Sequence, residues 1–208
     1  MEYKIIASSS LGNCVVIENV MVDAGISFKR IDENADLSKI DILLITHRHG
    51  DHLKVPTLKK ILEVNRRIKV FCNKDVALIL SHNGIKHTLL ELGSEVTIKD
   101  KNGGMVKFSA VNLYHDVPVY GFRITFDDFF DETKVFYATD TATLEGIVAK
   151  EYDYYFVETN YSEGNIDSFD EDRIIGTHLS REEAENFFVT MKKKTSVMIG
   201  LHRSSRNY

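Results

Sequence analysis

The residues best suited to chemistry lie in one short segment, HRHGDH, at positions 47–52. Its three imidazoles and one carboxylate come directly after IDILLIT (40–46), an apolar run of strand length. Imidazole and carboxylate groups are good ligands for zinc, manganese and iron. The first two histidines, at i and i+2 of an extended segment, can reach one ion, and the glycine lets the chain turn so that the Asp-His pair faces a second ion. A histidine-rich surface turn is the plain alternative, but it does not explain this density of ligands after a buried strand.

Further candidates each follow a predicted strand: Asp23, His115, Asp140 and His202. Taken alone, each has an ordinary explanation, a turn or helix cap for an aspartate and a hydrogen-bonded loop residue for a histidine. Together with the HRHGDH segment they form an ordered series, in which successive strands are followed by Asp, HxHxDH, His, Asp and His. Sites in layered α/β folds form where strands end. The series therefore predicts a metal site.

Apolar periodicity predicts the strands and helices that position these residues. Strands are expected at 3–7, at 14–22 (a pair that turns at Glu18-Asn19), and at 40–46, 68–72, 134–140, 152–158 and 196–201. A β-meander is expected from strands at 88–92, 95–99, 105–111 and 119–126. Helices are expected at 26–34, 54–64, 75–83 and 143–149.

The last helix has the clearest beginning. Ser180 and Glu183 form a capping box, and the apolar side chains of Ala184, Phe187, Phe188 and Met191 then fall on one helical face. Strands mixed with helices in both halves of the chain predict an α/β fold in which two sheets are sandwiched between helices, an αββα arrangement. We expect a single domain over 1–208.

Composition narrows the class of protein. With 208 residues, 43% of them hydrophobic, the chain can bury a core without a disulfide or a structural metal. Its two cysteines, Cys14 and Cys72, form neither a disulfide framework nor a CxxC motif. The N-terminus has no signal-peptide pattern and no run is apolar enough to span a membrane, so we expect a cytoplasmic protein without a membrane partner. The net charge of −5 lowers the expectation of non-specific nucleic-acid binding, although bound divalent ions would still attract a phosphodiester.

With these motifs in view, the sequence resembles the metallo-β-lactamase superfamily, and within it the small YycJ/WalJ-like branch. HxHxDH is typical of the superfamily, whereas an early SSSxGN with a late HLS and LHxSxxN is more specific for the branch. The matching stretches are ASSSLGN (7–13), VDAGIS (22–27), ITHRHGDH (45–52), YHDVPVYGF (114–122), YATDTA (137–142), FVETNYSEGNI (156–166), RIIGTHLSREEA (173–184) and GLHRSSRN (200–207).

The resemblance implies a role for each candidate. Asp23 would not bind a metal itself but would orient an imidazole that does. The ions would be zinc or manganese, and iron is also compatible with such ligands. One ion would be held by His47, His49 and His115, the other by Asp51, His52 and His202, with Asp140 bridging the two.

Two such ions imply a hydrolytic mechanism, in which a water shared by them loses a proton near neutral pH and attacks the substrate. We expect Asp51 to be essential for catalysis. His178 either protonates the leaving group or contacts the substrate phosphate, or it only supports its loop. Asn13 either lines the cleft or closes a structural turn. Arg203 and Arg206 are candidate phosphate contacts, although surface arginines are common.

Among the functions of the superfamily, the branch implies a nuclease, and specifically an exonuclease acting on DNA ends. True β-lactamases usually lack the bridging aspartate, and glyoxalase II-type thioesterases usually add a C-terminal helical domain. Because the chain is short and acidic, a phosphodiesterase that cleaves cyclic nucleotides is the alternative. A non-catalytic interaction module is disfavoured because all seven ligand positions are filled. The sequence leaves the oligomeric state open, a homodimer included.

Overall fold

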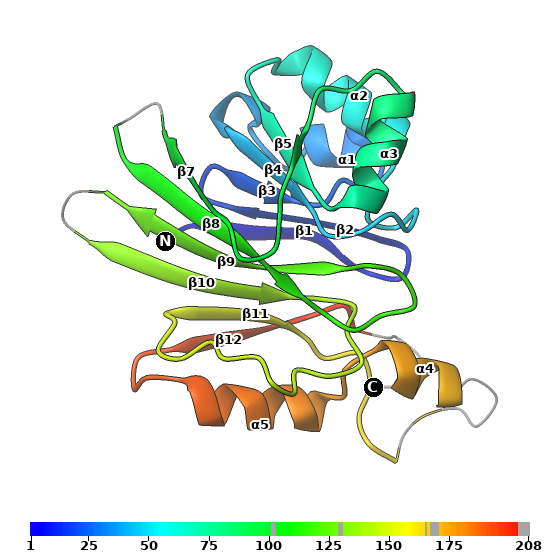
Figure 1. Ribbon diagram of the computed structural model, residues 1–208, viewed down its shortest axis with the longest axis vertical. Helices are drawn as coiled ribbons and strands as arrows, with labels where there is room; N and C mark the ends of the chain where they lie inside the picture. Colours follow the sequence, from blue (N-terminus) through cyan, green and yellow to red (C-terminus); the bar gives the residue numbers. More distant parts are fainter. Residues whose placement is uncertain (101–102, 129–130, 165, 167–170, 204–208) are drawn as a thin grey trace. The chain divides into compact units, whose positions relative to one another are not determined.

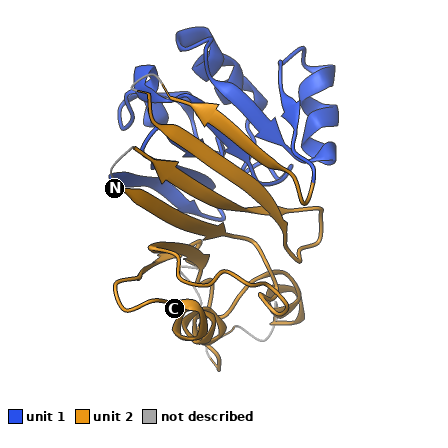
Figure 2. Cartoon of the chain, turned by 60° about the vertical axis from the view of Figure 1, so that its left-hand side comes forward, with its two compact units in different colours: residues 1–91 blue, residues 92–208 orange. Residues whose placement is uncertain are grey.

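A computed structural model describes residues 1–100, 103–128, 131–164, 166 and 171–203 of the chain. These residues form two compact units, Met1–Glu91 and Leu92–Tyr208 (Figure 2). Each unit is built on one six-stranded sheet. The single domain expected over 1–208 stays a prediction, and the two units are described separately below.

The sheet of unit 1 has its strands in sequence order, β1 to β6. The β1–β2 and β2–β3 pairs are antiparallel, and every later pair is parallel. Parallel neighbours need crossover connections, and helices provide them. As a result, β3, β4 and β5 end at the same edge of the sheet. The strands are β1 (Tyr3–Ser9), β2 (Gly12–Ile17), β3 (Val20–Val22), β4 (Ile42–Ile45), β5 (Lys69–Cys72) and β6 (Thr88–Leu89); the helices are α1 (Phe28–Asp32), η1 (Leu37–Lys39), α2 (Val55–Val64) and α3 (Lys74–His82).

The helices of unit 1 cover one face of its sheet (Figure 1). Alternate residues of β4, such as Leu43 and Ile45, pack in one cluster with Leu58 and Ile61 of α2. All four residues of β4 are buried. A strand that is buried on both faces has apolar residues at successive positions, which explains the apolar run in the sequence. The strand buried on both faces that the sequence predicts is thus confirmed, and it delivers the 47–52 segment to the edge of the sheet.

The sheet of unit 2 combines a meander with a parallel half. Strands β7 to β10 are antiparallel neighbours, and β10, β11 and β12 are parallel to one another. The parallel strands again end at a shared edge. The elements are β7 (Glu95–Lys99), β8 (Met105–Asn112), β9 (Tyr120–Asp127), β10 (Glu132–Ala138), β11 (Tyr154–Glu158), α4 (Glu171–Thr177), α5 (Arg181–Met191) and β12 (Val197–Leu201).

Helix α5 begins and packs as the sequence predicts. The Ser180 hydroxyl accepts a hydrogen bond from the Glu183 backbone N–H at 3.1 Å. The Phe187 ring lies 5.5 Å from that of Phe136 on β10, measured between centroids, and the Phe188 ring lies 5.3 Å from that of Tyr155 on β11. Aromatic pairs at these distances add to the stabilisation from apolar burial. The helix is thereby attached to the parallel half of the sheet.

Two expectations for the elements are wrong, and one helix was not predicted. The strand expected at 88–92 is β6, which pairs with β5 in unit 1 and is not part of the meander. No helix forms near 143–149, because the Thr141 and Thr143 hydroxyls bond the local backbone and Gly146 adopts a φ of 75° in a turn. Helix α4 was not expected at all.

No helix of the described residues is long and apolar enough to cross a membrane.

Gly25 permits the close packing that holds the 47–52 segment. A Cβ at this position would lie 1.7 Å from the Asp51 carbonyl oxygen, whereas a Cβ at Gly50 would meet no described heavy atom within 4 Å. We expect Gly25→Ala to lower the free energy of unfolding of the metal-free protein by about 2 kcal/mol or more. Gly50→Ala, the matched control, should stay within about 0.5 kcal/mol of wild type. Urea denaturation in a chelator measures both, and equal stabilities would contradict this account of the packing.

Candidate metal centre

The predicted metal ligands divide between the two units, and each follows closely on a strand. Unit 1 carries His47, His49, Asp51 and His52 after β4. Unit 2 carries His115 after β8, Asp140 after β10 and His202 after β12.

In unit 1, the Asp23 carboxylate orients the 47–52 segment through hydrogen bonds to Thr46 and His52. Asp23 follows β3 and Thr46 follows β4, and the parallel pairing of the two strands places these residues side by side. One carboxylate oxygen of Asp23 accepts the Thr46 backbone N–H at 2.8 Å, and the other lies 2.7 Å from His52 Nδ1. A carboxylate accepts only, so His52 Nδ1 carries the proton and Nε2 presents its lone pair.

His47 is oriented through the Thr46 hydroxyl. Thr46 Oγ1 lies 3.0 Å from His47 Nδ1 and within 3.0 Å of both Asp23 carboxylate oxygens. If the hydroxyl donates to the carboxylate, it accepts from His47 Nδ1, and His47 Nε2 is then also a lone-pair donor. His47 Nε2 lies 3.1 Å from His49 Nδ1. Two ring nitrogens this close can bind the same cation.

Burial dominates the electrostatics of this network. Asp23 is completely buried, and burial raises the pKa of its carboxyl, while the adjacent His52 imidazole acts in the opposite direction. A buried carboxylate is retained at such a cost only when it is fully hydrogen-bonded. The contacts to Thr46 and His52 meet this condition.

Asn13 supports the same segment. Its backbone N–H donates to the Asp51 carbonyl at 2.7 Å, and its side-chain amide lies 2.8 Å from His52 Nε2. The amide also donates to the Ser9 carbonyl at 3.0 Å. Asn13 is buried, so of the two readings left open by the sequence, these contacts favour the structural one.

In unit 2, His115 is held by a backbone carbonyl. Its Nδ1 donates to the Thr177 carbonyl at 2.8 Å, which leaves Nε2 as the lone-pair nitrogen. Burial lowers the pKa of His115, so the neutral form that can bind a metal is favoured.

Asp140, His202 and His178 lie together at the edge where β10, β11 and β12 end. The potential ligand atoms of these three residues and of Glu158 all lie within 4.8 Å of one another. His202 Nε2 is 3.4 Å from an Asp140 carboxylate oxygen, and the His178 and His202 rings stack at 5.2 Å between centroids. The structure therefore places His178 beside the predicted ligands of this unit.

Glu158 is the site residue that the sequence analysis missed. It ends β11, is completely buried, and accepts hydrogen bonds from His178 Nδ1 at 2.6 Å and from the Thr141 backbone N–H at 2.8 Å. Burial opposes its ionisation, but the His178 imidazole outweighs this and holds the pKa of Glu158 below its usual value. The available signal was its position, since Glu158 ends a buried strand as the other candidates do.

Unusual backbone conformations mark the same positions. Asp23, Asp140 and His202 have φ values of 64°, 53° and 51°, in the left-handed region that residues other than glycine rarely adopt. Such strain persists where the surrounding structure compensates for it and is concentrated at functional sites. Asp23 and His202 directly follow a strand, and Asp140 is the second residue after one.

The two arginine candidates differ in their outcome. Arg203 is exposed, and its guanidinium lies near Gly200 on β12, close in sequence to His202. Arg206 lies outside the described residues.

The donor chemistry within each unit fits divalent cations. Unit 1 presents imidazole lone pairs whose opposite ring nitrogens are engaged by Asp23 and Thr46. Unit 2 presents imidazoles and carboxylates in one buried cluster. Imidazole with carboxylate oxygen suits zinc, manganese and iron, and hydrogen bonds to the second ring nitrogen are what metal-binding histidines usually have.

The role of Glu158 can be tested without metal. Glu158→Ala removes the acceptor for Thr141 and His178, so the free energy of unfolding should fall by about 2–4 kcal/mol. The contribution of the carboxylate should be present near neutral pH and be lost as the pH falls through its lowered pKa. Urea denaturation in a chelator provides the measurement, with Glu145→Ala, on an exposed turn of the same unit, as control. Equal stability of the two variants would refute a supporting role for Glu158.

Comparison with known proteins identifies the family of the chain. The β-lactamase superfamily domain matches residues 18–202. The exodeoxyribonuclease WalJ of Streptococcus pneumoniae is 29% identical over 231 aligned positions, which cover 99% of this chain and 82% of WalJ.

Solved structures show the same fold. The metallo-β-lactamase fold protein YhfI of Bacillus subtilis superposes with a TM-score of 0.75 at 14% identity, covering 97% of this chain and 85% of YhfI. The short form of human tRNase Z gives a TM-score of 0.72 at 18% identity, covering 99% of this chain and 93% of that enzyme. The expected α/β fold of the metallo-β-lactamase type is confirmed, and the chain belongs to the metallo-β-lactamase superfamily of metal-dependent hydrolases.

Proposed function

We propose that this protein is a metal-dependent nuclease that acts on DNA ends. The observation that carries the proposal is the hydrogen-bonding of His47 and His52, whose Nδ1 atoms are engaged by Thr46 and Asp23 so that both Nε2 atoms present lone pairs. A metal bound at His52 Nε2 would take the place of the Asn13 amide, which lies 2.8 Å from that nitrogen. Family membership supports hydrolysis, and the similarity to an exodeoxyribonuclease along 99% of the chain supports DNA as the substrate. The cytoplasmic location and the oligomeric state stay predictions.

The proposed function requires two divalent ions. When bound, two divalent ions would activate water and neutralise charge on a phosphoryl oxygen. Zinc and manganese are the expected ions, and iron is compatible with the same ligands. We assign His47, His49 and His115 to one ion, Asp51, His52 and His202 to the other, and Asp140 to both.

The remaining residues of the site would orient ligands and move a proton. Asp23 and Thr46 hold the ring tautomers of His47 and His52, and Asn13 holds the loop that carries Asp51. Glu158 keeps the proton of His178 on Nδ1 when the ring is neutral. When the ring is charged, Nε2 carries a second proton, which His178 would give to the leaving oxygen of the cleaved nucleotide.

Arginine side chains would bind the phosphates that flank the cleaved bond. A guanidinium forms two parallel hydrogen bonds to a phosphate, so Arg203 and Arg206 suit this role. Both follow His202 within four positions of the chain.

A parallel cleavage assay tests the proposed function. Manganese-loaded wild type should release mononucleotides from 5′-phosphorylated linear DNA, and Asp51→Ala should lower the rate at least about 10²-fold, because loss of one ligand disrupts the site. His82→Ala, an exposed histidine at the end of α3, is the control and should retain activity. Bound metal is measured in the same samples, and both Asp51→Ala and His202→Ala should bind less than His82→Ala.

Each other outcome of this assay has a defined meaning. Cleavage of a cyclic nucleotide but not of DNA would replace the nuclease by a small-molecule phosphodiesterase. Activity of Asp51→Ala equal to that of wild type on every substrate would refute the metal-dependent hydrolase. Normal metal content in His202→Ala would refute the assignment of His202 as a metal ligand.

The leaving-group role of His178 is tested with a substrate that needs no proton. His178→Gln can still donate to Glu158 but cannot act as an acid. It should lower kcat on DNA by about 10²–10⁴-fold. On thymidine 5′-p-nitrophenyl phosphate, whose nitrophenolate leaves unprotonated, the loss should stay below about tenfold. Equal losses on the two substrates would show that His178 contacts the phosphate or supports its loop.

A further inference from the structure

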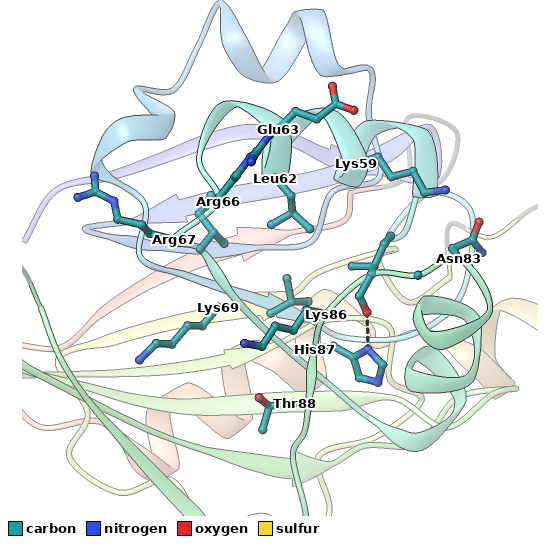
Figure 3. A pocket seen from close by; sticks show the side chains of 14 residues that line it. Lys59, Leu62, Glu63, Arg66, Arg67, Lys69, Asn83, Lys86, His87 and Thr88 are labelled. Atoms are coloured by element: carbon teal, nitrogen blue, oxygen red, sulfur yellow. Dashed lines mark hydrogen bonds between the residues drawn. The ribbon is translucent and has the colours of Figure 1, made fainter.

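Unit 1 contains a basic pocket at the opposite edge of its sheet from the 47–52 segment. The pocket has a volume of about 570 Å³ and lies where β5 and β6 begin, between the end of α2 and the turn that follows α3 (Figure 3). The 47–52 segment instead follows the end of β4, which runs parallel to β5. The pocket is therefore distinct from the candidate metal ligands of this unit.

The pocket is strongly basic in an acidic protein. Its lining includes five Lys or Arg residues and one Glu, a net charge of +4 when His87 is neutral, whereas the whole chain has a net charge of −5. Like charges gathered in this way repel one another and destabilise the fold unless an anion binds. The cations are Lys59, Arg66, Arg67, Lys69 and Lys86.

Some lysines elsewhere in the chain have carboxylate partners, whereas the cations of this pocket have none among the described residues. Lys134 pairs with Glu132 at 2.9 Å, and Lys193 pairs with Asp153 at 2.6 Å. Within the described residues, none of the five pocket cations forms a salt bridge. Their charges are thus available to a ligand.

The arrangement of the charges suits a chain of phosphates better than a single phosphate. The five cations come from α2, from the turn that follows it, from β5 and from the loop before β6. In Figure 3 Arg67, Lys69 and Lys86 extend toward one side of the pocket and Lys59 toward the other, while Glu63 lies at the top, away from Lys69 and Lys86. The charges do not converge on one point, as they would around one small anion.

Apolar side chains form the floor between these charges. Ile68, Val70 and Ile85 are buried, and Leu62 is half-buried. A basic groove that follows the phosphate backbone is typical of proteins that bind single-stranded nucleic acid, and the aliphatic floor adds an apolar surface between the charges. His87, whose Nδ1 donates to the Ile85 carbonyl at 2.8 Å, adds a ring at the side of the pocket.

We propose that this pocket is a second binding site for nucleic acid, which holds the phosphate backbone of a DNA strand away from the point of cleavage. The proposal rests on the proposed nuclease function and extends it, since it gives an acidic protein a local surface that attracts a polyanionic substrate.

The test compares two double variants with the same change of charge in the same unit. K69E/K86E reverses two exposed pocket lysines, and K4E/K39E reverses two exposed lysines outside the pocket. Binding of the manganese-loaded proteins to a fluorescent single-stranded 30-mer with phosphorothioate linkages, which resist cleavage, is measured by anisotropy at several salt concentrations. K69E/K86E should weaken binding at least about tenfold more than K4E/K39E, and the slope of log K against log salt should fall by about 1–2.

A small substrate separates this proposal from the proposed function. Both variants should hydrolyse thymidine 5′-p-nitrophenyl phosphate within about twofold of wild type, because that ester is too short to reach the second pocket. Equal DNA affinities of K69E/K86E and K4E/K39E would overturn the second site, even if wild type cleaves DNA. Selective loss of DNA binding in a protein that cleaves neither substrate would support the second site and refute the nuclease. If K69E/K86E fails to fold, R66E/R67E at exposed turn positions replaces it, with the same change of charge, the same expected loss and the same overturning result.

Discussion

The candidate site depends on one buried carboxylate, that of Asp23. Taking an ionised carboxylate out of water costs several kcal/mol unless hydrogen bonds replace the lost solvation. Here the Thr46 N–H, the Thr46 hydroxyl and His52 Nδ1 replace it, at 2.7–3.0 Å. The same bonds that compensate for burial also determine which ring nitrogen of His52 carries its proton. Stability and ligand chemistry are therefore two consequences of one contact.

In unit 2, a different buried carboxylate also orients an imidazole. Glu158 is buried at the end of β11, accepts from the Thr141 backbone, and directs the His178 ring. In unit 1 the carboxylate follows a strand whose parallel neighbour precedes the residues it orients, and in unit 2 it ends a strand whose parallel neighbour precedes Thr141, whereas His178 lies between α4 and α5. Parallel strands end at one edge of a sheet, so residues far apart in sequence meet there without a long loop. This geometry explains why the candidate ligands recur at strand ends along the chain.

Net charge and local charge have separate functions in this protein. The chain is acidic as a whole, yet a basic pocket lies at one edge of the unit 1 sheet and imidazoles lie at the other. Neutral imidazoles bind divalent cations without adding charge, and lysines and arginines bind phosphates over a longer range. An acidic composition therefore does not argue against a polyanionic substrate when the cations are gathered at one place.

Much of the secondary structure and of the site could be predicted from residues that are neighbours in the sequence. The HRHGDH segment, the buried strand before it and the capped helix after Ser180 could be predicted because their signals depend on neighbours within a few positions. Tertiary structure decided the rest. Glu158 contacts Thr141 and His178, which are 17 and 20 positions away, so no local pattern reveals its role. The strand at 88–89 belongs to the first sheet because it pairs with β5. The basic pocket forms only because crossover connections bring residues 59–70 and 83–88 together. Pairing and packing between distant segments depend on the whole fold, which a local sequence pattern does not encode.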